Sequence, residues 1–116
     1  MKKVIFHLPT CSTCQRLLKD WNTDGAELRD IRNEPITEEE IDEMARLAGS
    51  YEALFSRRAM KYRSMGLNEM NLSESDYRKH ILQEDTFLKR PVVIVGEQIF
   101  IGSAKKDVAA ASEALQ

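Results

Sequence analysis

The chain has 116 residues, of which 42% are hydrophobic and 31% are charged, and its formal net charge is −2. This length predicts one domain spanning residues 1–116. The balance of 17 Lys and Arg against 19 Asp and Glu excludes the strong positive field of a protein that binds nucleic acid directly. Two cysteines, Cys11 and Cys14, are too few for a disulfide-rich scaffold.

No segment predicts secretion or insertion into a membrane. The apolar run 4–6 stops at His7, short of the roughly 7–15 apolar residues of a signal peptide. No stretch approaches the roughly 18 apolar residues of a membrane span. We therefore expect a cytoplasmic protein with no membrane partner, in which a close cysteine pair indicates redox chemistry or metal binding.

The first thirty residues predict a strand, a helix and a second strand. Residues 4–8 form a short apolar run that ends at Pro9, which is typical of a buried strand. Residues 26–31 alternate apolar and polar side chains, as a half-buried strand does. Between them, four side chains recur at the spacing of one inward helix face: Cys14, Leu17, Leu18 and Trp21.

The middle of the chain, about residues 37–86, predicts helices. Thr37 and Glu40 have the spacing of a capping box, which opens a helix that Gly49 closes. Residues 53–65 predict a short helix with turns. A second capping segment at 72–76 opens a helix whose inward side chains are Tyr77, Ile81 and Leu82.

The last third predicts a hairpin and a helix. Residues 92–95 and 98–101 are β-prone runs, and Gly96 opens the two-residue connection of a type II′ turn. Ser103 is expected to cap a final helix over residues 104–115. The order of elements predicts an α/β domain with a mixed four-stranded sheet.

The cysteine pair stands where a strand ends and a helix begins. Unpaired backbone N–H groups and the positive end of the helix dipole favour a thiolate at such a position. Cys14 belongs to the inward face and should be shielded, whereas Cys11 precedes the first turn and should be exposed. This difference favours Cys11 as the attacking thiol and Cys14 as the resolving thiol.

Two other interpretations of the pair remain open at this point. A zinc site usually needs four ligands, and beyond the cysteines only His7 and His80 offer nitrogen ligands, so we expect no metal. The two cysteines can also be small residues that merely fill a helix start.

Two segments carry arginines that can take part in the chemistry of Cys11. Arg90 precedes Pro91, which should stand at the first position of its strand and can be cis. Arg57 and Arg58 belong to a local basic cluster. If at least one of these three arginines faces Cys11, it would favour the thiolate and help to bind an oxyanion. The alternative is that they are solvated surface charges.

Three segments together resemble the ArsC/Spx family. They are residues 11–16 (CSTCQR), residues 88–94 (LKRPVVI) and the arginine-bearing stretch 55–62 (FSRRAMKY). The resemblance extends over about residues 3–115. It implies a thioredoxin-like fold with a mixed four-stranded sheet and a helical insertion, and it strengthens the expectation that Pro91 is cis.

The family holds two classes of function. In its glutaredoxin-coupled arsenate reductases one cysteine attacks arsenate, and the resemblance assigns that role to Cys11, with Arg58 (or Arg57) and Arg90 as the oxyanion-binding arginines. Its Spx-type regulators bind RNA polymerase and use the cysteine pair as a disulfide switch. Cys14 matches the Spx pattern, because such arsenate reductases commonly carry serine there.

The chain departs from the family pattern at two places. Both classes place arginine directly after the fourth motif position, where this chain has Gln15. Arg16 comes one residue later, a helical rotation of about 100°. The arsenate reductases also use an arginine after the hairpin, where this chain has only Lys105 and Lys106.

We therefore predict a thiol-dependent oxidoreductase. Cys11 attacks an oxidised or oxyanionic substrate, and Cys14 resolves the adduct. No cofactor is expected to be bound, and glutathione or a thioredoxin or glutaredoxin partner supplies electrons. The alternative is an Spx-like, redox-sensing transcriptional regulator whose partner is RNA polymerase.

Overall fold

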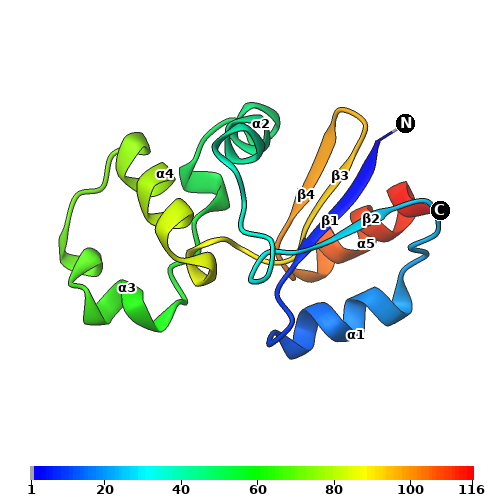
Figure 1. Cartoon of the computed structure of the whole chain (residues 1–116), viewed down its shortest axis with the longest axis horizontal. Helices are drawn as coiled ribbons and strands as arrows, with labels where there is room; N and C mark the ends of the chain where they lie inside the picture. Colours follow the sequence, from blue (N-terminus) through cyan, green and yellow to red (C-terminus); the bar gives the residue numbers. More distant parts are fainter. Residues whose placement is uncertain (1) are drawn as a thin grey trace. The chain divides into compact units, whose positions relative to one another are not determined.

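A computed structural model describes residues 2–116 (Figure 1). The chain divides into two compact units. The sheet unit comprises the residues up to Pro35 together with Arg90–Gln116, and the helical unit comprises Ile36–Lys89. Within residues 2–116, no helix has both the length and the apolar character that crossing a membrane requires.

The sheet unit is built on four strands in the order β2-β1-β3-β4. β1 (Lys3–His7) pairs in parallel with β2 (Glu27–Asp30), and it pairs antiparallel with β3 (Val92–Val95). β4 (Gln98–Ile101) completes the hairpin with β3. The predicted mixed four-stranded sheet is confirmed. β1 and β3 are the central strands, which is why their apolar runs are buried.

Helices α1 (Ser12–Asp20) and α5 (Lys105–Leu115) pack on one face of this sheet (Figure 1). Their inward side chains meet Ile5 and its cross-strand neighbour Val93. Burial of such aliphatic side chains contributes about 1.5–3 kcal/mol each. The buried cluster consists of Ile5, Leu17, Trp21, Val93, Val95, Ala111 and Leu115. This core anchors α1, the helix whose N-terminal end carries the cysteines.

The predicted turn of the hairpin is confirmed, but the predicted N-terminus of the last helix is wrong. Gly96 has a φ of 59°, and no non-glycine residue among those described has a positive φ, which matches a type II′ turn with glycine first. The predicted cap by Ser103 is wrong. Ala104 keeps an extended backbone, with φ −63° and ψ 143°, so α5 begins one residue later and no side chain caps it.

The helical unit holds α2 (Glu38–Ala48), α3 (Met60–Ser64) and α4 (Glu74–Gln83), with three single-turn 3₁₀ helices between and after them. Both predicted caps form: Thr37 and Glu40 make a capping box on α2, and Ser73 makes one on α4. The predicted helix at 53–65 is interrupted, because Glu52–Leu54 is a 3₁₀ turn and only Met60–Ser64 is α-helical. The ring of Phe55 stacks on that of Phe87 at 5.1 Å.

Candidate functional site

The turn between β1 and α1 presents the cysteine pair. The carbonyl of Leu8 accepts a hydrogen bond from the N–H of Cys11 at 3.0 Å, with Pro9 at the second position of this tight turn. Cys11 is the N-cap of α1: its carbonyl accepts from the N–H of Gln15 at 3.1 Å. Its Sγ accepts from the N–H of Cys14 at 3.5 Å. The sulfur therefore occupies the place of an N-cap oxygen, facing donors that stabilise negative charge.

The two sulfurs have opposite acidities. Partial burial of Cys11 opposes its ionisation, but the N–H of Cys14, the thiol of Cys14 and the guanidinium of Arg90 outweigh it and lower the pKa of Cys11. Burial raises the pKa of Cys14 to about 12, and a charge on Cys11 contributes to this rise. Cys14 is fully buried whereas Cys11 is partly exposed. Cys11 is therefore the thiol that ionises first and that a substrate can reach.

Arg90 is one of the cations that the sheet unit places near Cys11. It directly precedes Pro91 and β3, and the Arg90–Pro91 peptide bond is cis. Phe6 near the end of β1 pairs with Val92 at the start of β3, so the backbone brings residue 90 to the end of the sheet where α1 begins. Through hydrogen bonding and its positive charge, the guanidinium of Arg90 favours the thiolate and so helps to lower the pKa of Cys11.

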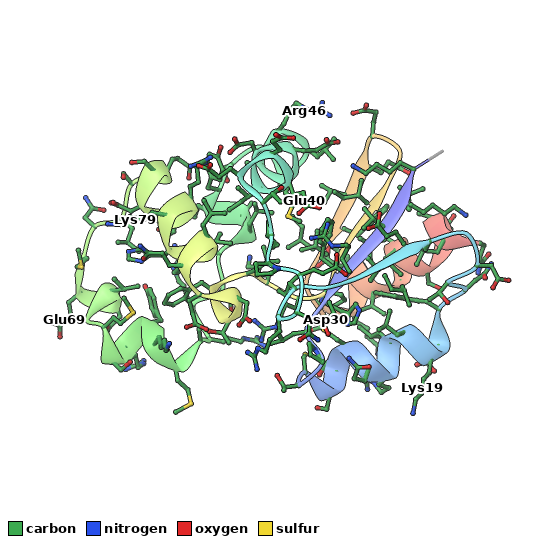
Figure 2. All side chains as sticks on the ribbon, viewed as in Figure 1. Lys19, Asp30, Glu40, Arg46, Glu69 and Lys79 are labelled. Carbon is green, nitrogen blue, oxygen red and sulfur yellow. The ribbon has the colours of Figure 1, made fainter. Side chains whose placement is uncertain are left out.

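A second guanidinium reaches the cysteine turn from the segment after β2. Arg32 Nη1 donates to the hydroxyl of Thr10 at 3.4 Å, and Thr10 is the residue before Cys11. Asp30 fixes this segment by accepting from the backbone N–H of Arg32 at 2.9 Å and of Asn33 at 3.2 Å. Figure 2 shows Asp30 at the end of β2, toward the side of the sheet where α1 begins. Arg32 could not be predicted from the sequence, because an aspartate after a strand predicts a turn but not the direction of the side chains that follow it.

Gln15 and Arg16 have different environments. The side-chain amide of Gln15 donates to the Leu8 carbonyl at 3.3 Å, so it braces the turn that carries Cys11. Arg16 is exposed on α1. One position along a helix is a rotation of about 100°, which explains why the two side chains point in different directions.

Arg57 and Arg58 belong to the helical unit. Arg57 Nη2 donates to Glu52 Oε2 at 2.8 Å and to the Tyr77 hydroxyl at 3.0 Å, so partners within that unit hold it. Arg58 is exposed, and its backbone N–H donates to the Ser56 hydroxyl at 3.4 Å. Their role as oxyanion ligands beside Cys11 stays a prediction.

The donor set at this site suits thiol chemistry. Over residues 2–116, no group of three or more His, Cys, Asp or Glu side chains lies together in an arrangement that could hold a metal ion. What the structure brings together is an accessible thiol of lowered pKa, a buried thiol one helical turn away and the guanidinium of Arg90. A pair with these properties can attack an electrophilic centre and then close an internal disulfide.

The model of the ArsC family matches residues 6–111 of the chain. The chain belongs to the ArsC family. The matched range includes the cysteine turn, the whole helical unit and most of α5, and it confirms the family that the sequence motifs indicated.

Relatives of this ArsC-family chain fall into two classes. Global transcriptional regulator Spx 1 of Bacillus cereus is 25% identical over 107 residues, which cover 90% of this chain and 82% of that protein. An arsenate reductase of Acidiphilium multivorum is 26% identical over 93 residues, covering 78% of this chain and 66% of that protein. The solved structure of an arsenate reductase from Vibrio cholerae has a TM-score of 0.79 at 19% identity and covers 99% of this chain and 98% of that chain. The ArsC-type thioredoxin-like fold is therefore confirmed.

At residue 15 this ArsC-family chain departs from the cysteine motif of the family. Gln15 occupies the position of the motif arginine and uses its amide on the Leu8 carbonyl rather than presenting a charge. Arg16 does not take its place, since it lies on the exposed side of α1. The charges that the sheet unit brings to the cysteine turn come instead from Arg90 and Arg32.

Proposed function

We propose that this ArsC-family chain is a thiol-dependent oxidoreductase in which Cys11 is the nucleophile and Cys14 resolves the adduct. The observation that carries this proposal is the inequality of the two thiols. Cys11 has a lowered pKa and is partly exposed, whereas Cys14 has a pKa raised to about 12 and is buried. Attack requires a thiolate that the substrate can reach, and only Cys11 combines both properties.

The first half of the reaction forms a bond to Cys11. With a disulfide substrate, the Cys11 thiolate attacks one sulfur, the S–S bond of the substrate breaks, and one thiolate leaves and takes a proton from water. With an arsenate-like oxyanion, the Cys11 sulfur bonds to the central atom and an oxygen leaves as water. Arg90 stabilises the negative charge in either case.

The second half uses Cys14. Bonding at Cys11 removes the thiolate whose charge raises the pKa of Cys14, so Cys14 loses its proton more easily at that stage. The Cys14 sulfur then attacks the Cys11 sulfur, a Cys11–Cys14 disulfide forms, and the substrate leaves with the electron pair of its bond to Cys11. Two electrons pass from the protein to the substrate. Glutathione, or a glutaredoxin or thioredoxin of the reducing cytoplasm, restores the dithiol.

The test compares wild type with Cys11→Ser and Cys14→Ser. Reduced protein is mixed with 2-hydroxyethyl disulfide, and in parallel with arsenate in a glutathione- and glutaredoxin-coupled assay. We expect no turnover by Cys11→Ser and a trapped adduct on Cys14→Ser that mass spectrometry detects. Equal reactivity of the two thiols, or turnover by Cys11→Ser, would overturn the assigned roles.

A second candidate function is an Spx-like regulator gated by the same disulfide. Two observations favour it: Cys14 matches the Spx pattern, and Spx 1 of Bacillus cereus matches over 90% of this chain. In this function the Cys11–Cys14 disulfide changes a surface that binds RNA polymerase. The distinguishing experiment is retention of RNA polymerase on immobilised protein in its reduced and oxidised forms. Equal retention of the polymerase by reduced and by oxidised wild type would exclude the disulfide switch, and a Cys11→Ser, Cys14→Ser double variant, which cannot form the disulfide, is the control.

A further inference from the structure

Gln15 closes a ring of hydrogen bonds around Cys11. The N–H of Cys11 donates to the Leu8 carbonyl at 3.0 Å, and the carbonyl of Cys11 accepts from the N–H of Gln15 at 3.1 Å. The side-chain amide of Gln15 then donates to the same Leu8 carbonyl at 3.3 Å. The backbone on both sides of Cys11 is therefore tied, directly or through Leu8, to one residue near the start of α1.

Position 15 is suited to this contact by helix geometry. Side chains of an α-helix tilt toward its N-terminus, and residues four apart lie on one face, so the side chain of Gln15 extends back past Cys11 to the residue that begins the turn. The amide carries no titratable proton, so it remains a donor at every pH at which Cys11 titrates. The exposed Arg16, rotated by about 100°, makes no such contact with Leu8.

The bond from the amide fills the second acceptor position of a buried carbonyl. A carbonyl oxygen has two lone pairs, and the Leu8 oxygen uses one for the N–H of Cys11 and the other for Gln15. Leu8 is only 3% exposed, so water is a poor substitute for a lost partner. Without the amide, the Leu8 peptide group lowers its free energy by turning toward another donor, and this movement shifts the backbone of Cys11.

The acidity of Cys11 depends on the backbone conformation that this ring fixes. Cys11 is the N-cap of α1, with φ −90° and ψ 106°, and in this conformation its Sγ accepts from the N–H of Cys14 at 3.5 Å. Burial opposes ionisation, but hydrogen bonding from Cys14 is among the effects that outweigh it and lower the pKa of Cys11. A shift of the Cys11 backbone would weaken this contact and with it the stabilisation of the thiolate.

We propose that Gln15 is a positioning residue for the nucleophile: its amide holds the Leu8 carbonyl so that Cys11 stays in the N-cap conformation that stabilises its thiolate. This inference rests on the proposed function, because it assigns Gln15 to the step in which Cys11 attacks. Gln15 takes no part in bond formation or electron transfer, and it acts on the sulfur through the turn that begins at Leu8.

The experiment measures the pH profile of the Cys11 thiol. Fully reduced, full-length protein reacts with iodoacetamide at pH values from about 5 to 10, and peptide mapping by mass spectrometry gives the initial rate at Cys11. Wild type is compared with Gln15→Met, which removes the amide but keeps an unbranched side chain of similar helix propensity. Gln98→Met is the matched control, because it makes the same replacement at an exposed position of β4 in the sheet unit.

We expect Gln15→Met to move the midpoint of the profile to higher pH and to slow the reaction below the midpoint by about two- to fivefold, a range that corresponds to the net strength of one weak hydrogen bond. The plateau rate at high pH should stay close to the wild-type value, and Gln15→Ala should show the same change. Gln98→Met should reproduce the wild-type profile. A merely structural role of Gln15 would change the plateau rate and leave the midpoint in place. An unchanged midpoint in both Gln15 variants would overturn the proposal.

A neutral disulfide distinguishes failure of this inference from failure of the proposed function. Wild-type protein that is alkylated at Cys11 but does not reduce 2-hydroxyethyl disulfide would refute the proposed oxidoreductase function. The iodoacetamide profile would still test Gln15, because alkylation needs a thiolate but no redox step. A midpoint that rises in the Gln15 variants then supports the positioning role, and an unchanged midpoint removes it.

Discussion

Replacing Cys14 with alanine should change how the stability of the reduced protein depends on alkaline pH. In the unfolded chain the Cys14 thiol loses its proton near the ordinary pKa of 9.0, whereas in the folded protein it keeps the proton until about pH 12. Between these values the folded state binds one more proton than the unfolded state does. Stability contributed by Cys14 is therefore complete below pH 9 and is lost as the pH rises.

The size of the effect follows from the separation of the two pKa values. Each pH unit corresponds to about 1.36 kcal/mol, so the window of about three units represents roughly 4 kcal/mol in total. Between pH 9 and about 10.5 the wild type should lose about 2 kcal/mol of unfolding free energy relative to Cys14→Ala. Cys11 acts in the opposite direction near pH 9, because its pKa is lower in the folded protein than in the unfolded chain, and it is present in both of the proteins that are compared.

The assay is urea unfolding of reduced wild type and Cys14→Ala at several pH values from about 8 to 10.5, with a phosphine reductant and without oxygen. Titration of tyrosines and lysines affects both proteins and cancels in the difference. Cys11→Ser is the matched control, since it keeps Cys14 buried and should keep the negative slope. Parallel pH profiles of wild type and Cys14→Ala would refute the conclusion that the Cys14 thiol is strongly desolvated.

Three further predictions address the site and its scaffold. Arg90→Gln removes a positive charge that favours the Cys11 thiolate, so the pKa of Cys11 should rise and its alkylation by iodoacetamide at pH 7 should slow. Arg16→Gln, the control, should leave the alkylation rate unchanged. Thr37→Ala removes the cap of α2 and should lower the free energy of unfolding by about 1 kcal/mol, measured with urea. Thr37→Ser keeps a capping hydroxyl and should keep most of the wild-type stability, so an equal loss in both variants would contradict a capping role. Leu115→Ala opens a cavity at a fully buried position and should cost about 2–5 kcal/mol, and a loss below 1 kcal/mol would show that the core collapses around it.

The parts of the fold that local chemistry decides could be predicted from the sequence. The capping box of Thr37 and Glu40 needs only neighbours three residues apart, and the structure contains both of its hydrogen bonds. The helical spacing of Cys14 with Leu17 likewise predicted which cysteine is buried. Each of these patterns lies within one or two helical turns, so contacts with distant residues have little effect on it.

The start of α5 shows where local chemistry stops being decisive. Ser103 is a good capping residue, but the antiparallel partner of the hairpin fixes the backbone just before it: the N–H of Gly102 donates to the carbonyl of Pro91 at 2.9 Å. After that pairing Gly102 takes a φ of 86° and the chain bends at Gly102 and Ser103, so the extended Ala104 becomes the N-cap and the helix begins one residue later. A contact between residues that are distant in sequence therefore overrides the local preference.

The same limit explains why the site was only partly foreseen. The pair Cys11 and Cys14 could be found from spacing, whereas the hydrogen bond of Arg32 to Thr10 joins residues 22 positions apart and depends on the parallel register of β1 and β2. A shift of that register by one residue would turn the end of β2 to the other face of the sheet. The position of Arg32 beside the cysteine turn is thus a property of strand pairing, whereas Arg90 could be found from the motif that contains it.

Gln15, which replaces the arginine of the family motif, affects which substrates can bind at Cys11. Where the family motif has a charged side chain, this chain has an amide that donates to the Leu8 carbonyl at 3.3 Å, the same carbonyl that receives the N–H of Cys11. The substitution removes a positive charge from the first turn of α1 and adds a brace to the turn that holds the nucleophile. A multiply charged oxyanion loses a binding partner from this exchange, but a disulfide, which is neutral at its reacting sulfurs, does not.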